Sequence, residues 1–462
     1  MKKRTLLPES QRKNAAPEKN AQYAAVLKKM VDCKTVWTKD GVNKAEYEKF
    51  YQVVAESFPI LHSKAQRLTF GDGCFFYVLE GENANKNILL MSHHDVVDGG
   101  EGWETDPFNA VEKEGYLYGR GTIDTKTPLF AELQAAEELL AAGYNFPGMN
   151  LYIGSSHNEE VGGDGMVLAV EYFQSQGIRF DVILDEGGAI TTGMIPGVKA
   201  KSAMVAVHEK SRHQYLCTAK QNDSGHTGLT PNEDSMVSRM AAFMTEVNKA
   251  NVYRGMFHPE VRATFEYHAP YMDFPMNVLF GNLTLFAPII KKIMLSIPQT
   301  RPMLATGSTF TSIFAGKKEH PTFRAQEAEA TLFLRCIRED DLYAGLEKIK
   351  AIGKKYGVEL TEVERDYCRP TDFRGQGYQI LEQTLNENFP DVIVAPFLLT
   401  AGTDARRFSE IADSILRFAP IDLNKAQFAA IHNKNEHIGL ENVGQCVVFY
   451  KDFVRKMENY QK

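Results

Sequence analysis

The stretch KNILLMSHHDVV, residues 86–97, decides the fold class of this 462-residue chain. It contains a short apolar run, Ile88–Met91, which is typical of a strand that is buried on both faces of a sheet. Two side chains that can bind a metal, His93 and Asp95, follow the run directly. A buried strand that ends in such residues indicates an α/β sheet with a site at the carboxyl ends of its strands.

The same pattern continues outward from this stretch. Further apolar runs at 151–153 and 182–184 predict two more buried strands. Between the three runs lie helical patterns at 129–140 and 166–173, which Gly143 and Gly177 are placed to end. Strands that alternate with helices predict an α/β fold with a mostly parallel sheet flanked by helices.

The pattern changes near residue 208, which predicts a second domain. Strand-like stretches at 214–219 and 328–337 bracket a helix that starts near residue 234, and a helix at 341–356 leads into a strand at 358–363. We therefore expect an α+β domain at 208–369, inserted between two parts of the first domain at 1–207 and 370–462.

Side chains that bind divalent metals stand at the ends of the predicted strands, just ahead of a predicted helix in the case of Asp124, or near the end of the chain. Seven residues make up this set: His93, Asp95, Asp124, Glu159, Glu160, Asp185 and His432. The carboxyl ends of neighbouring parallel strands line one crevice, so we expect these side chains to converge there. Imidazole nitrogens and carboxylate oxygens together suit a borderline divalent ion.

A charge count fits a centre with two metal ions. Two divalent ions bring about +4, the carboxylates of Asp124, Glu160 and Asp185 bring about −3, and a bridging hydroxide balances the remainder. His93 and His432 then act as neutral ligands, one for each ion.

The two remaining acids can assist such a centre without binding a metal. Glu159 can take a proton from metal-bound water, as a carboxylate beside a metal-bound hydroxide does. Asp95 can accept the second N–H of the His93 ring and so fix its tautomer.

Five blocks of the sequence, in order, resemble the dizinc aminoacylase and carboxypeptidase family of metallopeptidases. They are SHHDVV (92–97), WETDPF…GYLYGRGTIDTK (103–126), NEEVGGDG (158–165), LDEGG (184–188) and the late GTDARRF with IHNKNEHI. The resemblance implies two Zn²⁺ ions, with Mn²⁺ or Co²⁺ as possible substitutes. It implies the same ligands as the charge count, with Asp124 as the bridge, Glu159 as the general base and Asp95 as the residue that orients a ligand.

The resemblance also implies that the inserted domain is a lid that forms a homodimer. SGHTGLTP (224–231) is similar to a lid motif whose histidine, here His226, would help to polarise the substrate carbonyl. Arg406 and Arg335 are candidates to bind a free substrate carboxylate, although either could equally form a structural ion pair. The stretch 255–303 resembles an insertion in the lid; its aromatic residues either line an acyl pocket or, as we favour, pack the enlarged lid.

These features predict a hydrolase that cleaves an amide bond next to a free carboxylate by attack of metal-bound hydroxide. Carboxypeptidase or dipeptidase action and hydrolysis of an N-acyl amino acid fit the same residues. The alternative is a catalytically inactive relative that acts as a binding or scaffold protein.

Composition narrows the setting in which this chemistry takes place. Lys and Arg number 52 against 59 Asp and Glu, and the net charge of −7 argues against nucleic acid or an anionic membrane as a partner. The six cysteines form no Cys-x-x-Cys pair, and no apolar run follows the basic N-terminus. A reducing, cytoplasmic location is therefore expected.

Overall fold

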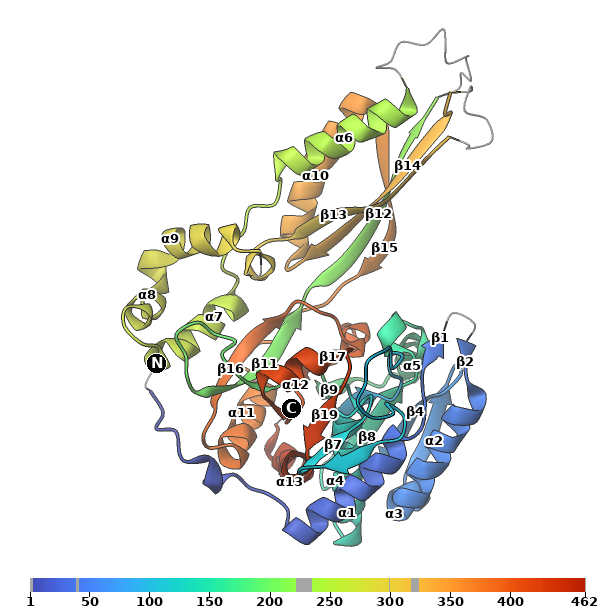
Figure 1. Ribbon diagram of the computed structural model, residues 1–462, viewed down its shortest axis with the longest axis vertical. Helices are drawn as coiled ribbons and strands as arrows, with labels where there is room; N and C mark the ends of the chain where they lie inside the picture. Colours follow the sequence, from blue (N-terminus) through green and yellow to red (C-terminus); the bar gives the residue numbers. More distant parts are fainter. Residues whose placement is uncertain (1–2, 39–40, 222–234, 299, 317–323, 462) are drawn as a thin grey trace. The chain divides into compact units, whose positions relative to one another are not determined.

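The computed structural model describes residues 3–38, 41–221, 235–298, 300–316 and 324–461, which are drawn in colour in Figure 1. They form two compact units. The first comprises Met1–His208, Ala263–Asn282 and Arg369–Lys462, and the second comprises Glu209–Arg262 and Leu283–Cys368. This division differs from the predicted domain ranges chiefly in one segment, because Ala263–Asn282 belongs to the first unit.

A large mixed sheet forms the centre of the first unit, and the α/β prediction is confirmed. Its strands are hydrogen-bonded in the order β18-β10-β11-β17-β9-β5-β8-β4-β3, and β16 also pairs with β11. Strands β17, β9, β5 and β8 are mutually parallel, whereas β4 and β3 continue the sheet in antiparallel fashion. The bounds are β3 Gln66–Phe70, β4 Cys74–Leu79, β5 Lys86–His93, β8 Met149–Ser156, β9 Phe180–Asp185, β10 Ile190–Thr192, β11 Lys201–Glu209, β16 Ile393–Leu399, β17 Ala412–Arg417 and β18 Asp422–Leu423.

Alternate residues of the central strands enter two separate hydrophobic cores. Ile88 and Leu90 of β5 join the core that contains side chains of α1, α4 and α13, whereas Leu89 and Met91 join the core beneath α5. The sheet is therefore covered on both faces, as the continuous apolar runs predicted. The helices with residues in this unit are α1 Pro17–Val31, α2 Lys44–Ser57, α3 Pro59–Lys64, α4 Lys126–Ala141, α5 Gly165–Ser175, α7 Pro259–His268, α8 Met276–Gly281, α11 Gln376–Asn388, α12 Lys425–Ala430 and α13 Leu440–Lys456.

Two small sheets complete the first unit. One pairs β1 (Trp37–Thr38) with β2 (Gly41–Val42), and the other has the order β19-β7-β6. The latter consists of β6 Val111–Lys113, β7 Tyr116–Tyr118 and β19 His437–Gly439. Through β7 and β19 this small sheet joins the segment that precedes α4 to the segment that follows α12.

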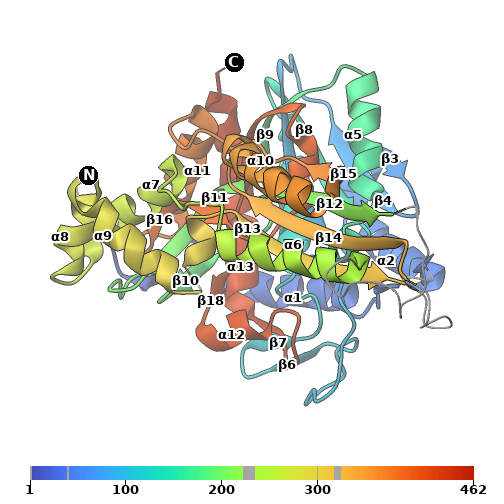
Figure 2. The same ribbon diagram turned by 90° about the horizontal axis from the view of Figure 1, so that it is seen from above.

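The second unit is a four-stranded antiparallel sheet in the order β13-β14-β12-β15. Helices α6 and α10 pack side by side against it, and their apolar residues share one core with alternate residues of β12 and β14 (Figure 2). The bounds are α6 Met236–Ala250, α9 Leu283–Ser296, α10 Glu339–Tyr356, β12 Ser211–Lys220, β13 Gly307–Ala315, β14 Glu327–Cys336 and β15 Val358–Asp366. The apolar face of α6 is thus core packing.

The predicted insertion at 255–303 is divided between the two units. Phe265 of α7 and Phe280 of α8 are both buried, and their rings stack with centroids 4.7 Å apart. These two aromatic residues therefore pack within the first unit and not within the lid, and Phe274 of the same segment is 81% exposed. In the described part of the chain no helix is both long and apolar enough to cross a bilayer.

Candidate metal centre and its cavity

Three of the predicted metal ligands, His93, Glu160 and His432, meet around a fourth, Asp124. Its Oδ1 lies 3.0 Å from Nε2 of His93, and its Oδ2 lies 2.9 Å from Nε2 of His432. The same His432 nitrogen lies 3.0 Å from Oε2 of Glu160. Potential ligand atoms of His93, Asp124 and Glu160 all lie within 4.8 Å of one another. Each oxygen of Asp124 thus faces a different imidazole, as a carboxylate shared between two metal ions requires.

The ends of secondary-structure elements position these side chains. His93 is the last residue of β5 and pairs with Ser156, the last residue of the parallel strand β8. Asp124 lies two residues before α4, and Glu160 lies in a single 3-10 turn after β8. His432 follows α12 with a φ of 56°, a left-handed conformation that is uncommon for a residue with a side chain. Such backbone conformations concentrate at functional sites.

Asp95 connects the first histidine to the glutamate pair. The Nδ1–H of His93 donates to the backbone carbonyl of Asp95 at 2.9 Å, which leaves Nε2 to face the site. The Asp95 carboxylate is fully buried; Oδ1 lies 3.5 Å from the same Nδ1. Its two oxygens accept the backbone N–H groups of Glu159 and Glu160, each at 3.1 Å. Asp95 therefore orients the glutamate turn as well as the His93 ring.

The neighbouring His94 has a structural environment. Its ring stacks on Phe50 with centroids 4.9 Å apart and an interplanar angle of 9°, and its Nδ1 lies 2.8 Å from Oγ of Ser155. Burial lowers the pKa of His94 well below its usual value, so this ring is neutral. Of the two adjacent histidines, His93 is the one that faces the site.

Burial and opposed charges shift the pKa values at this centre. Burial alone would raise the pKa of Asp124, but hydrogen bonds from His432 and His93 lower it below its usual value. Hydrogen bonds to Asp124 and Glu160 raise the pKa of His432 to about 10. Burial raises the pKa of Glu159 well above the usual range for a glutamate. The site thus concentrates carboxylates that need positive charge as a counterpart.

The donor set fits divalent metal ions. Every facing atom is an imidazole nitrogen or a carboxylate oxygen. Oε1 of Glu160 is buried and has no hydrogen-bond partner among the described residues, although Oε2 faces His432. A buried carboxylate oxygen without a partner is costly unless a cation binds it. The residues present therefore suit a metal centre.

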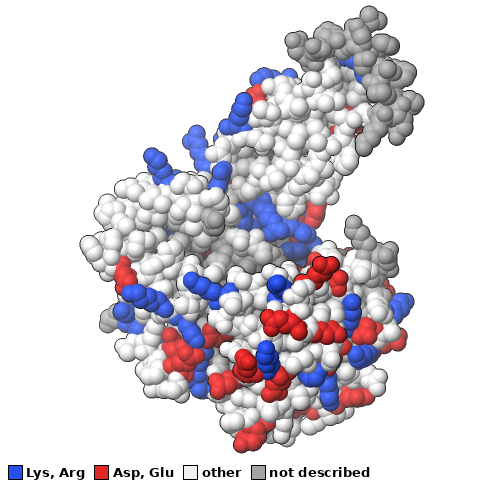
Figure 3. All heavy atoms as spheres, in the orientation of Figure 1, with Lys and Arg blue, Asp and Glu red and all other residues white. Residues whose placement is uncertain are grey.

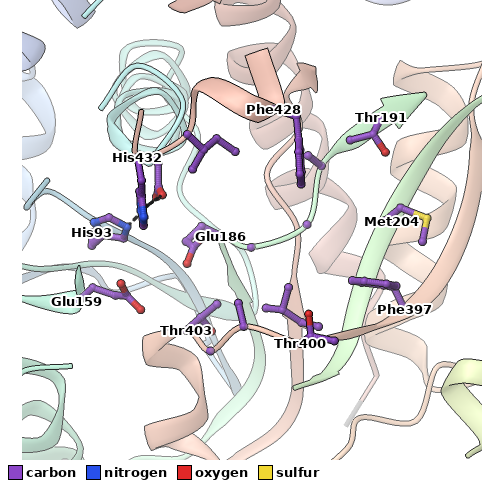
Figure 4. A pocket seen from close by; sticks show the side chains of 18 of the residues that line it. His93, Glu159, Glu186, Thr191, Met204, Phe397, Thr400, Thr403, Phe428 and His432 are labelled. Carbon is purple, nitrogen blue, oxygen red and sulfur yellow. Dashed lines mark hydrogen bonds and ion pairs between the residues drawn. The ribbon is translucent and has the colours of Figure 1, made fainter. Parts of the chain in front are cut away.

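The predicted ligand Asp185 is the last residue of β9 and precedes a second acid, Glu186. Its Oδ1 accepts the N–H of Glu186 at 2.9 Å, and its Oδ2 accepts the N–H of Ala405 at 3.0 Å. Asp185 does not line the cavity at the centre, whereas Glu186 does. Figure 4 shows the Glu186 side chain on the same side of that cavity as His93 and Glu159. Glu186 lies in the bend that follows the end of β9, so it is the acid of this pair that faces the cavity, and a metal-binding role stays a prediction for Asp185.

Sequence reasoning also missed Glu436, which is buried beneath the centre. Its carboxylate accepts the backbone N–H groups of Gly121 (3.1 Å), Ile123 (2.7 Å) and Asp124 (3.1 Å). Nη1 of Arg120 donates to the same carboxylate at 2.6 Å. Glu436 lies four residues after His432, so it links the loop that carries Asp124 to the segment that carries His432. The sequence feature that could have pointed to Glu436 is its position in the block IHNKNEHI, which carries part of the family resemblance.

A cavity of about 390 Å³ opens at the metal centre, and its described lining comes from the first unit. One end is polar and contains His93, Asp124, Glu159, Glu160, Glu186 and His432. The remainder includes the apolar side chains of Met194, Met204, Phe397, Leu399, Phe428 and Ile431 (Figure 4). The described lining residues include no Lys or Arg.

Of the three remaining predicted residues, the two that the structure describes do not line the cavity. Arg406 is buried in the 3-10 segment Asp404–Phe408 and does not line the cavity. Burial raises the pKa of Asp404, and the positive charge of the nearby Arg406 opposes that increase. Arg335 belongs to β14 of the second unit, where its guanidinium lies 5.8 Å from the ring centroid of Phe333. His226 lies outside the described residues. A role in substrate binding stays a prediction for all three.

Comparison with known proteins agrees with this geometry. The model of peptidase family M20/M25/M40 matches residues 89–456, which include every residue of the centre. The chain belongs to this family. The N-fatty-acyl-amino acid synthase/hydrolase PM20D1 of Xenopus tropicalis is 31% identical over 456 residues, which cover 96% of this chain and 87% of that protein. A probable carboxypeptidase S-like protein of Dictyostelium discoideum is 27% identical over 90% of this chain and 80% of its own length.

Solved structures show the same fold. An M20 family metallo-carboxypeptidase of Sulfolobus solfataricus superposes with a TM-score of 0.66 at 15% identity, over 95% of this chain and all of that chain. A solved structure from Bacillus subtilis, at 10% identity and a TM-score of 0.58, is described as a dinuclear metal binding peptidase of the M20 family. The chain is therefore a metallopeptidase-type amidohydrolase that hydrolyses amide bonds with the help of metal, and nothing in the site favours an inactive scaffold.

Proposed function

We propose that this protein hydrolyses N-acyl amino acids that carry an apolar acyl chain. The observation that supports this proposal most directly is the cavity, which joins a polar, metal-binding end to an apolar one. An N-acyl amino acid has the same division, because its amide bond separates a polar amino acid from a hydrocarbon chain. Relatives named N-fatty-acyl-amino acid synthase/hydrolase, at 29–31% identity, support the same substrate class.

In this proposal five residues hold two Zn²⁺ ions: His93, Asp124, Glu160, Glu186 and His432. Asp124 would hold both ions, because each of its oxygens faces a different histidine. The three carboxylates bring about −3 and the two imidazoles are neutral, so the site suits two divalent ions with a total charge of about +4. Mn²⁺ or Co²⁺ can substitute for Zn²⁺. When bound, such ions polarise the substrate carbonyl and lower the pKa of water.

Glu159 moves the proton in this reaction. It lies at the polar end of the cavity and its backbone is fixed by Asp95. Its raised pKa suits a carboxylate that first accepts a proton from the attacking water and then donates it to the leaving amine. The carboxylate of Asp95 is fully occupied by backbone donors, so Asp95 positions Glu159 and does not exchange protons.

The apolar end of the cavity binds the acyl chain. Phe397, Leu399 and Phe428 offer only hydrocarbon surface there, and water leaves that surface when the chain enters. Recognition of the free carboxylate is assigned to an arginine outside the cavity lining, Arg335 or Arg406, and polarisation of the carbonyl to His226, as the family resemblance predicts.

Carboxypeptidase or dipeptidase action is the second candidate, because the Dictyostelium relative is named a probable carboxypeptidase. A matched set of substrates separates the two: N-lauroyl-leucine, N-acetyl-leucine and alanyl-leucine, assayed with Zn²⁺, Mn²⁺ and Co²⁺. All three release leucine, so only the acyl side varies. We expect kcat/KM for the lauroyl substrate to exceed that for the acetyl substrate by at least ~10-fold, since buried methylenes add binding energy. Preference for alanyl-leucine would establish the peptidase instead.

Two further parts of the proposal concern the protein's setting. The six cysteines are all buried and none forms a disulfide, which supports a reducing, cytoplasmic location. The homodimer through the inserted domain rests on the family resemblance, and light scattering of the purified protein measures it directly.

A further inference from the structure

Helix α9 presents an apolar stripe to solvent. Leu283, Ile290 and Met294 form its buried face. On a different face Leu285, Ile289 and Ile293 are 74%, 61% and 54% exposed. Their spacing of four residues aligns them over about 12 Å of helix. A surface helix normally has one apolar face, so the second one needs a partner.

The rest of the second unit holds α9 in place. A Cβ on Gly255 would lie 2.6 Å from a methyl carbon of Leu295, so the backbone of that segment packs closely against the helix. Past its C-terminal end, Nζ of the buried Lys210 donates to the carbonyls of Pro302 (2.9 Å) and Ala305 (2.8 Å). The exposed stripe therefore belongs to an anchored helix.

The charged residues of the chain segment that carries the stripe have one sign. Residues 274–318 contain no Asp or Glu, although the whole chain has 59 in 462 residues. In α9 itself the charged residues are Lys291 and Lys292, and Arg301 follows. Figure 3 shows the surface at the position of α9 in white, with blue side chains beside it. An apolar strip beside lysines is complementary to a membrane surface that contains anionic lipids.

We propose that α9 docks this protein onto anionic lipid surfaces. With 14 residues the helix is too short to span a bilayer, which takes ~20, so it lies in the interface with its stripe among the acyl chains. A second copy of the chain fits less well, because a symmetric contact would bring both lysine pairs together with no acid in 274–318 to neutralise them. From the net charge of −7 we expected no membrane partner. That value is a sum over the whole chain, and it does not reveal that the segment 274–318 is cationic.

Vesicle flotation with the full chain tests the proposal, which does not depend on the proposed substrate. The probes are phosphatidylcholine vesicles with and without 30% phosphatidylserine. We expect binding to the anionic vesicles to exceed binding to neutral ones by at least ~10-fold. Either I289S/I293S or K291E/K292E should reduce that binding at least ~10-fold. The circular dichroism spectra of both variants should match that of the wild type, which shows that they are folded.

Two controls match these variants on other helices of the second unit. V237S alters an exposed apolar residue of α6, and K348E/K354E reverses two exposed lysines of α10. Both controls should bind vesicles like the wild type. Equal binding of wild type and α9 variants would overturn the proposal. The proposal would also be overturned if the wild type did not bind vesicles and I289S/I293S changed the oligomeric state. In that case the stripe of α9 would contact a second copy of the chain.

Discussion

The carboxylate of Glu436 accepts the backbone N–H of Asp124 at 3.1 Å. Glu436 is fully buried and also accepts N–H groups from Gly121 and Ile123. The two oxygens of Asp124 face His93 and His432. The backbone of Asp124 is thus held in place by the same chain segment that carries His432. Outer residues of this kind set the orientation of metal ligands and hence the affinity for the ion.

We predict that Glu436→Gln weakens metal binding. The glutamine amide offers one acceptor oxygen in place of two, so at least one N–H of the Asp124 loop loses its partner. By analogy with other outer-shell residues, affinity for Zn²⁺ should fall ~10–100-fold. Titration calorimetry of the metal-free protein measures this. Glu441→Gln, an exposed position on α13, is the control and should bind Zn²⁺ normally. If Glu436→Gln bound Zn²⁺ with unchanged affinity, Glu436 would not be a residue that orients the metal ligands.

Glu186 and Asp185 should differ in metal content. If Glu186 faces the ions, Glu186→Ala should retain about one fewer metal ion per chain. Asp185→Asn should retain the wild-type number, because the Asp185 carboxylate is occupied by the N–H groups of Glu186 and Ala405. Elemental analysis after dialysis compares the two. The reverse pattern would restore Asp185 as the ligand.

Residues and spacing predicted much of the fold. Apolar runs correctly placed β5, β8 and β9, because a strand buried on both faces needs them. Parallel strands bring their ends together, which is why His93 and the Glu159–Glu160 pair could be placed at one edge without a structure. The antiparallel strand β4 has a comparable apolar run, CFFYVL, whereas β3, with the sequence QRLTF, has none.

Orientation at single residues could not be predicted. LDEGG contains two adjacent acids, and which one faces the ions depends on how the chain leaves β9. The role of Glu436 arises from contacts with residues more than 300 positions away in the sequence. The burial of Arg406 likewise follows from the packing around its 3-10 segment, which an arginine in sequence does not indicate.

We predict that Glu159→Gln lowers kcat by ~10²–10⁴-fold while both metal ions are retained. Glutamine keeps the size of the side chain but cannot accept the proton. The measurement is kcat on N-acetyl-leucine together with metal content. Glu101→Gln, at an exposed position, is the control. A variant that keeps most of its turnover would show that another group is the base.

Phe428 should set the preference for long acyl chains. It lines the apolar end of the cavity and is 46% exposed there. Phe428→Ala removes hydrocarbon surface worth about 1–2 kcal/mol, so kcat/KM for N-lauroyl-leucine should fall ~5–30-fold. The value for N-acetyl-leucine should change little. Phe314→Ala, at an exposed residue of β13, is the matched control. Equal losses on both substrates would place the acyl chain elsewhere.

Stability at low pH should depend on Glu138, which joins α4 to α13. Nζ of Lys451 lies 2.5 Å from its Oε2, and Tyr23 and Lys19 also donate to the carboxylate. Burial would raise the pKa of Glu138, but these donors lower it to about 2, below the unfolded value of 4.5. A folded pKa below the unfolded one stabilises the protein above pH 4.5, and that stability is lost as the pH falls toward 2.

The ion pair is partly exposed, so we discount its energy for solvent screening. At pH 7 wild type should then be about 1–2 kcal/mol more stable than Glu138→Gln, and the difference should shrink between pH 4.5 and 2. Urea unfolding at a series of pH values measures it. Glu171→Gln, at an exposed position of α5, should follow the wild-type curve. Because the metal centre is the same in all three proteins, only the difference between curves reports on Glu138. A difference that stays constant from pH 7 to 2 would mean that the side chain stabilises α4 and α13 by packing, independently of its charge.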